Sequence, residues 1–170
     1  MSSKWIGAIF IIAGCGGCGF SVAAAGKREI RMLREFLRAV QFMECELQYK
    51  LTTLPELCRK AGNTTSGNVR EVFVNLAREL DWQTEPDAGS CMNEALKKSS
   101  GLPMRLHRMF FELGATLGRF DLSGQLKDLK QISLSCEDAL RECCQDQEIR
   151  FRSYRTLGLC AGAALAILLL

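Results

Sequence analysis

The chain has 170 residues, of which 48% are hydrophobic and 24% are charged, and its formal net charge is +3. All the charged residues except Lys4 lie between Lys27 and Arg155, so two uncharged ends bracket a middle segment with the charge density of a soluble domain. This distribution excludes a wholly soluble protein, a polytopic transporter, a disordered chain and a collagen-like or repeat protein.

The first predicted element is an N-terminal transmembrane segment, residues 1–26. Its uncharged run, Trp5–Gly26, has 22 residues. As a helix, that run would extend over about 33 Å, enough to cross the hydrocarbon core of a bilayer. The sequence therefore predicts a membrane span at this end.

Two patterns in the same segment suggest export instead. Cys15 ends a lipobox-like sequence, Ile12–Cys15, and Val22–Ala25 resembles a signal-peptidase site. Against export, five basic residues follow the run and only Lys4 precedes it, and basic residues near a membrane stay on the cytoplasmic side. An exported lipoprotein with a helical ligand-binding domain, anchored through Cys15, is the alternative function. The five basic residues are Lys27, Arg28, Arg31, Arg34 and Arg38.

The middle domain, 27–155, shows helical periodicity throughout and no convincing strand-like alternation. Six helices with short links predict an all-α, antiparallel six-helix bundle, flanked by the two terminal spans. The most apolar helix, 103–119, is expected to lie centrally and to be buried on most sides. We expect the first helix to continue from the first span to about residue 51. Four helices should follow at 53–61, 66–83, 87–99 and 103–119, and the sixth should run from about residue 123 towards the membrane.

The most distinctive local pattern joins the fifth expected helix to the sixth. Gly114 and Gly118 are one helical turn apart, where each glycine costs about 1 kcal/mol relative to alanine. They predict a close approach of a neighbouring helix, the alternative being that Gly118 merely ends its helix. Asp121, or else Ser123, is expected to cap the last helix, and Gln125 can bond back near the turn.

The C-terminal run, 156–170, has 15 uncharged residues. Such a helix is about 22 Å long and short of a comfortable span. We expect a short second transmembrane segment, although a helix that dips into one leaflet or packs on the domain is the alternative. Gly158 and Gly162 form a GxxxG pair that suits helix–helix contact in lipid. Basic residues next to both runs predict a cytoplasmic middle domain with both termini outside.

No catalytic, cofactor-binding or metal-binding constellation is found. His107 is the only histidine, which excludes a multi-histidine metal site. Gly62 and Gly67 have the spacing of a phosphate-binding loop, but Asn68 and Val69 stand where lysine and serine or threonine are needed. Nine cysteines, an odd number, favour free thiols in a reducing compartment. We expect no enzyme, no cofactor and no binding of nucleic acid, because the domain body lacks a basic excess.

Three parts of the sequence together resemble the stage III sporulation protein AB family of endospore-forming bacteria. They are Leu47–Leu57, the pattern LGATLGRFDLSGQL at 113–126, and the ending Tyr154–Gly162 that leads into an aliphatic tail. That family is similar to the inner-membrane platform proteins of type II secretion and type IV pilus machines, whose cytoplasmic domains are six-helix bundles.

The resemblance implies a non-enzymatic membrane platform in the channel between mother cell and forespore. Its expected partners are a cytosolic secretion-type ATPase similar to stage III sporulation protein AA, other membrane subunits of the channel, and membrane lipid. A homo-oligomer is compatible with this role. The expected location is the mother-cell membrane around the forespore, and Cys58 and Cys91 should be shielded from an impermeant thiol reagent until that membrane is broken.

Overall fold

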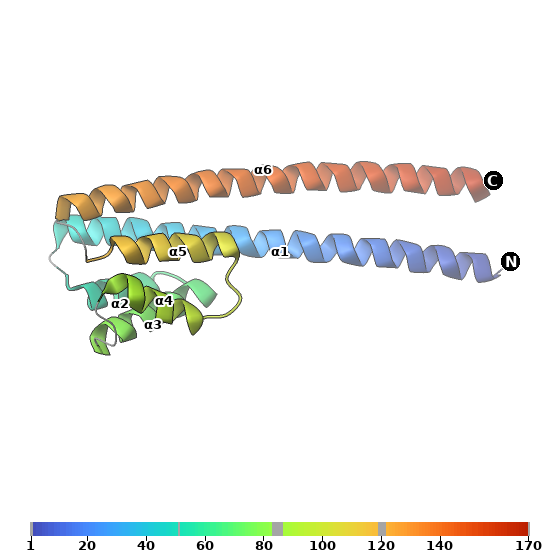
Figure 1. Ribbon diagram of the computed structural model, residues 1–170. Coiled ribbons are helices and arrows are strands. Elements are labelled where there is room, and N and C mark those ends of the chain that lie inside the picture. The colour runs from blue at the N-terminus through green and yellow to red at the C-terminus, as the bar shows by residue number, and fades with distance from the viewer. Residues whose placement is uncertain (1, 51, 83–86, 119–121, 170) are drawn as a thin grey trace. The chain divides into compact units, whose positions relative to one another are not determined.

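The structure, a computed structural model, describes the backbone of residues 2–50, 52–82, 87–118 and 122–169, and the side chains of residues 26–147 within those ranges. In these ranges the chain forms six helices and no strand, so the prediction of an all-helical fold is confirmed (Figure 1). The helices are α1 (Ser2–Tyr49), α2 (Leu54–Asn63), α3 (Gly67–Trp82), α4 (Ala88–Lys97), α5 (Met104–Thr116) and α6 (Leu122–Leu169).

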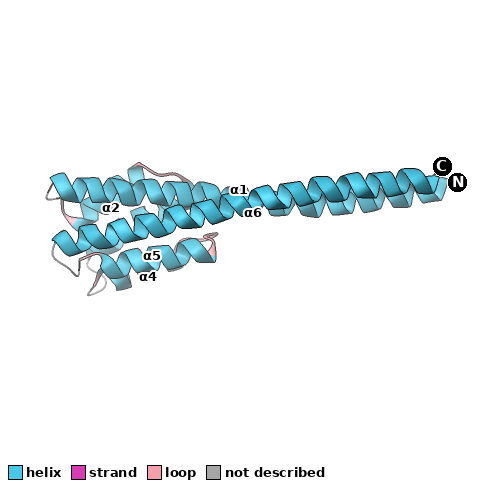
Figure 2. Ribbon diagram, turned by 90° about the horizontal axis from the view of Figure 1, so that it is seen from above, coloured by secondary structure: helices cyan, strands magenta, loops and turns pink. Residues whose placement is uncertain are grey.

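The chain divides into two compact units. The terminal unit combines Met1–Ile30 with Arg141–Leu170, and the helical domain is Arg31–Leu140. In the terminal unit, the first part of α1 and the last part of α6 lie side by side and antiparallel, with the N and C ends together (Figures 1 and 2). In the helical domain, α2 packs on α3, α3 on α4 and α4 on α5.

The two predicted membrane spans, 1–26 and 156–170, fall on parts of α1 and α6 whose side chains, apart from Gly26, lie outside the described residues. Cys15 of the lipobox-like sequence lies there too. Among the residues that are described, no helix has both the length and the apolar character that crossing a membrane requires.

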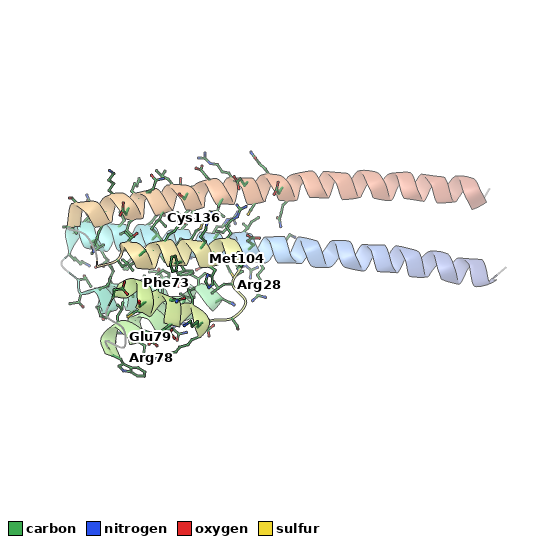
Figure 3. All side chains as sticks on the ribbon, viewed as in Figure 1. Arg28, Phe73, Arg78, Glu79, Met104 and Cys136 are labelled. Carbon is green, nitrogen blue, oxygen red and sulfur yellow. The ribbon has the colours of Figure 1, made fainter. Side chains whose placement is uncertain are left out.

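The core of the helical domain contains three phenylalanines from three different helices. The ring of Phe110 in α5 meets Phe36 of α1 at a centroid distance of 4.7 Å and Phe73 of α3 at 5.3 Å, both edge-on. All three side chains are fully buried. Edge-to-face pairs add to the stabilisation that burial of the rings provides. Phe110 therefore lies where α1, α3 and α5 meet, and Figure 3 shows Phe73 beneath α5.

Local sequence explains the limits of the short helices. Asp87 caps α4, because its carboxylate accepts a hydrogen bond from the Ser90 N–H at 2.9 Å. Pro55 lies in the first turn of α2. Backbone N–H groups there have no hydrogen-bond acceptor within the helix, so the lack of an N–H in proline costs no helical hydrogen bond. Helix α2 ends two residues later than expected, since the Thr64 N–H bonds back to the carbonyls of Lys60 and Ala61 and closes a further turn.

Buried cysteines fill the core as small apolar side chains. Cys58, Cys91 and Cys136 are buried, and all six described cysteines are free thiols. Cys136 of α6 contacts α1 within the helical domain, with its Sγ 3.4 Å from the carbonyl oxygen of Leu33. Burial raises the pKa of the Cys58 thiol to about 12, because an apolar environment disfavours the thiolate. This thiol is therefore inert at neutral pH.

Candidate interaction surfaces

Gly114 lies where the backbones of α4 and α5 approach each other closely. A Cβ atom at Gly114 would lie 2.4 Å from the Cβ of Met92 and 2.8 Å from its Cγ. Real Cβ atoms do not approach other carbons so closely, since protein interiors are already packed to van der Waals contact. The neighbouring helix expected at this position is thus α4, and the glycine is what allows the contact.

Gly118 does not belong to the same helical stripe, and that expectation was wrong. Helix α5 ends at Thr116, and Leu117 turns to an extended backbone with ψ 128°. Gly118 then adopts φ +79°, a left-handed conformation that favours glycine over residues with a Cβ atom. The alternative interpretation, in which Gly118 ends the helix, describes the structure.

The remaining sequence-predicted site residues do not gather around Gly114. Asp121 lies outside the described residues, and α6 begins at Leu122, so Ser123 lies inside the helix and is not its N-cap. Gln125 is half-buried in the first turn of α6, and its side chain bonds to no residue that the structure describes. Gly158 and Gly162 lie within α6, and their surroundings are outside the described part.

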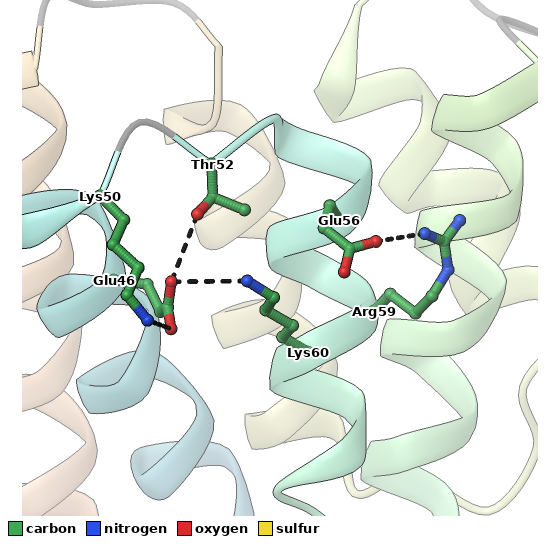
Figure 4. Close-up of polar contacts among 6 residues, drawn as sticks. All are labelled: Glu46, Lys50, Thr52, Glu56, Arg59 and Lys60. Carbon is green, nitrogen blue, oxygen red and sulfur yellow. Dashed lines mark hydrogen bonds and ion pairs between the residues drawn. The ribbon is translucent and has the colours of Figure 1, made fainter.

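A charged cluster that sequence reasoning missed joins the end of α1 to α2 (Figure 4). The nearly buried carboxylate of Glu46 accepts hydrogen bonds from Lys50 Nζ at 3.1 Å and Thr52 Oγ1 at 3.2 Å, and Lys60 Nζ lies 3.7 Å away. The hydrogen bond from Lys50, with the positive charges of Lys50 and Lys60, holds the pKa of Glu46 below its usual value against the opposite effect of burial. The i,i+4 spacing of Glu46 and Lys50 could have predicted their ion pair from the sequence. The contact with Lys60 could not be predicted, because it depends on how α2 packs beside α1.

A second missed cluster ties α3 to the loop after α4. Glu79 is only 1% exposed and accepts a hydrogen bond from Lys98 Nζ at 2.5 Å. One and three turns earlier on the same face of α3, Asn75 donates to Ser99 Oγ at 3.3 Å and Asn68 donates to the Ser100 carbonyl at 2.5 Å. The three contacts hold the loop against α3, and Glu79 is labelled in Figure 3.

Helix α5 exposes one face of mixed character to solvent, which we call the α5 surface and define as Met104, His107, Arg108 and Phe111. These residues recur at i, i+3, i+4 and i+7 and therefore lie on one side of the helix. Met104 is 84% exposed and Phe111 52% exposed, and Met104 stands at the start of α5 in Figure 3. The expectation that this helix is buried on most sides was wrong, since its opposite face alone forms core.

The α5 surface combines exposed apolar side chains with an exposed ion pair. Exposed apolar patches that are rimmed by polar residues often mark protein–protein contacts, and here Met104 and Phe111 share one face of α5 with His107 and Arg108. Arg108 lies 3.6 Å from Glu112 in an exposed i,i+4 ion pair, which is worth little to stability. Among the described residues, no three His, Cys, Asp or Glu side chains lie close enough together to hold a metal ion.

Comparison with known proteins identifies the family. The family model of stage III sporulation protein AB matches residues 4–170. The chain belongs to the stage III sporulation protein AB family. Stage III sporulation protein AB of Bacillus subtilis (strain 168) is 26% identical over 170 residues, which cover 98% of this chain and 99% of the relative.

A solved structure of stage III sporulation protein AB has the same fold. It aligns with a TM-score of 0.64 and covers 72% of this chain and 98% of the solved chain. The sequence identity is 23%, so the likeness concerns the fold alone. The resemblance inferred from Leu47–Leu57, 113–126 and the C-terminal ending is confirmed by these findings.

Proposed function

We propose that the chain is a non-enzymatic membrane platform component of the channel between mother cell and forespore. In this role the helical domain docks a cytosolic secretion-type ATPase similar to stage III sporulation protein AA. Membership of a stage III sporulation family supports a part in that stage. The docking of an ATPase, the channel and the platform role are proposed in addition to that family membership.

The uncharged runs at both ends support membrane anchorage. In this proposal Trp5–Gly26 and 156–170 cross the membrane that surrounds the forespore, and the helical domain faces the mother-cell cytosol. The basic residues beside both runs favour that orientation, because arginine and lysine resist transfer across a membrane. Gly158 and Gly162 would contact other membrane subunits of the channel, or a second copy of the chain, through close helix packing.

The observation that carries the docking proposal is the α5 surface. Two large apolar side chains, Met104 and Phe111, are exposed to solvent on the side of α5 that does not face the core. Burying exposed apolar area against a partner is favourable by about 25 cal/mol per Å². Aromatic and methionine side chains are enriched at the centres of interfaces, so this face is where we place the ATPase.

Replacing both side chains, as Met104→Ser with Phe111→Ser, is expected to weaken ATPase binding by roughly 30-fold, the effect of losing an interface hot spot. The measurement is titration of the purified ATPase against the full chain in detergent. Trp82→Ser is the matched control: Trp82 is 71% exposed but lies on α3, and its loss should leave the affinity unchanged. Absence of binding by the unaltered chain would refute docking, and unchanged affinity of the double variant would refute this surface.

A further inference from the structure

Two arginines of α1 have no partner in the described part of the chain. Arg31 and Arg34 are exposed, and neither forms a hydrogen bond or ion pair with any described residue. Arg38, one turn further on, is different: its Nη1 lies 3.3 Å from Glu35, and that carboxylate also accepts the Ser66 N–H at 3.1 Å. The positive charge of Arg31 and Arg34 is therefore paired with no residue that the structure describes.

The place of these arginines along α1 suggests what compensates them. They follow Gly26, the last residue of the uncharged run, by five and eight residues in one continuous helix. At about 1.5 Å per residue, that is roughly 8 and 12 Å along the helix axis. Side chains of an α-helix tilt towards its N-terminus, so both guanidinium groups lean back towards the uncharged run. Their reach covers the level at which lipid headgroups would lie.

The position of Arg31 and Arg34, next to the run that we propose to cross the membrane, favours a lipid over an acidic protein segment as their partner. Lys27 and Arg28, which also follow the uncharged run, already interact within the chain. Arg31 and Arg34 are thus the nearest basic residues to the run for which the structure describes none of these contacts, and they lie three residues apart on one face. A guanidinium group offers paired donors that match the oxygens of a phosphate.

We infer that Arg31 and Arg34 form a binding site for the headgroups of anionic phospholipids. The inference rests on the membrane anchorage in the proposed function, and it adds a lipid class and the residues that select it. A basic residue near an anionic membrane surface is attracted strongly enough to shift lipid partition about fivefold. The attraction falls off within about 8 Å at physiological salt. Arg31 lies at roughly this distance from Gly26 along the helix axis, and Arg34, about 12 Å away, reaches back towards Gly26 through its long side chain.

The test measures which lipids the full chain retains. The chain, purified in detergent, is incubated with equal amounts of phosphatidylglycerol and phosphatidylcholine, and the lipids that stay bound through gel filtration are quantified by mass spectrometry. We expect the unaltered chain to retain more phosphatidylglycerol than phosphatidylcholine. The double variant Arg31→Gln with Arg34→Gln should lose this enrichment by about fivefold for each arginine that is replaced. The double variant Arg31→Lys with Arg34→Lys should keep most of the phosphatidylglycerol enrichment, because the positive charges remain.

The matched control is Arg70→Gln with Arg78→Gln, which removes two exposed arginines from α3 and should leave the lipid ratio unchanged. Equal retention of both lipids by the unaltered chain, or an unchanged ratio in the Arg31 and Arg34 double variant, would overturn the inference. Flotation with vesicles of phosphatidylcholine alone separates the two proposals. A chain that floats but shows no preference refutes only the lipid site, whereas a chain that does not float refutes the membrane anchorage and the lipid site with it.

Discussion

Replacing Phe110 by alanine is expected to lower the free energy of unfolding of the helical domain by about 3–5 kcal/mol. Phe110 is fully buried and forms edge-on ring pairs with both Phe36 and Phe73. Truncation removes both pairs and leaves a cavity among α1, α3 and α5, which a packed core fills only in part. Because small domains are stable by only about 5–15 kcal/mol, this loss is a large fraction of the stability of the domain.

The measurement is urea denaturation of the full chain in detergent, followed by circular dichroism. The adjacent residue gives the control, since Phe111 is 52% exposed and Phe111→Ala should change stability by less than about 1 kcal/mol. Equal destabilisation by the two substitutions would contradict the assignment of a buried and an exposed face to α5. The same control shows whether Phe111 acts in ATPase binding without acting in folding.

Gly114→Ala should cost about 3 kcal/mol of folding free energy, although alanine is the better helix former by about 1 kcal/mol. The added methyl would lie 2.4 Å from Met92 Cβ. That atom is attached directly to the backbone, so a rotamer change of Met92 gives no relief and α4 itself must move. A further Met92→Ala substitution should therefore leave most of the loss in place, whereas Met92→Gly should relieve the clash.

Gly89→Ala is the matched control for this substitution, because Gly89 belongs to the same pair of helices. A Cβ atom there would lie 3.5 Å from Asp87 Oδ2 and 3.8 Å from Ala115 Cα, which are ordinary contacts. We expect no loss of stability, or a small gain from helix propensity. Thermal unfolding of the four variants and the unaltered chain checks the series. Destabilisation by Gly89→Ala equal to that of Gly114→Ala would contradict the close approach at Gly114.

The positions of the helices could be predicted from the sequence because apolar residues recur at helical spacing and turn residues separate the runs. Which side of each helix faces the core was harder to predict. On α3, the structure buries the carboxylate of Glu79 and leaves the neighbouring apolar side chain of Leu80 half-buried. A carboxylate is buried there only because Lys98, which follows α4, reaches it, and that partner is set by tertiary structure.

The surfaces required the three-dimensional structure for the same reason. Gly114 and Gly118 look alike in sequence, but one is buried against α4 and the other takes a left-handed backbone conformation after the helix. Met104 and Phe111 are apolar residues of a helix that was expected to be buried on most sides, but the structure leaves both exposed to solvent. Apolar spacing alone does not say whether a partner helix comes from the same chain or from another protein.

The burial of two cysteines changes how topology should be tested. Cys58 and Cys91 were expected to be shielded from an impermeant reagent by the membrane, yet both are buried in the folded domain. The fold would shield them on either side of a membrane, and the raised pKa of Cys58, about 12, keeps its thiol unreactive. Cys45 is exposed on α1, so its labelling reports the side of the membrane and not the packing of the core.

The proposed platform role requires the helical domain to face the mother-cell cytosol, and labelling of Cys45 tests this requirement directly. An impermeant maleimide is added to intact sporulating cells and to permeabilised cells, with a Cys45→Ser variant to assign the label. We predict that Cys45 is modified only after permeabilisation. Modification of Cys45 in intact cells would place the domain outside the cytosol and contradict the membrane topology, the docking of a cytosolic ATPase and the platform role.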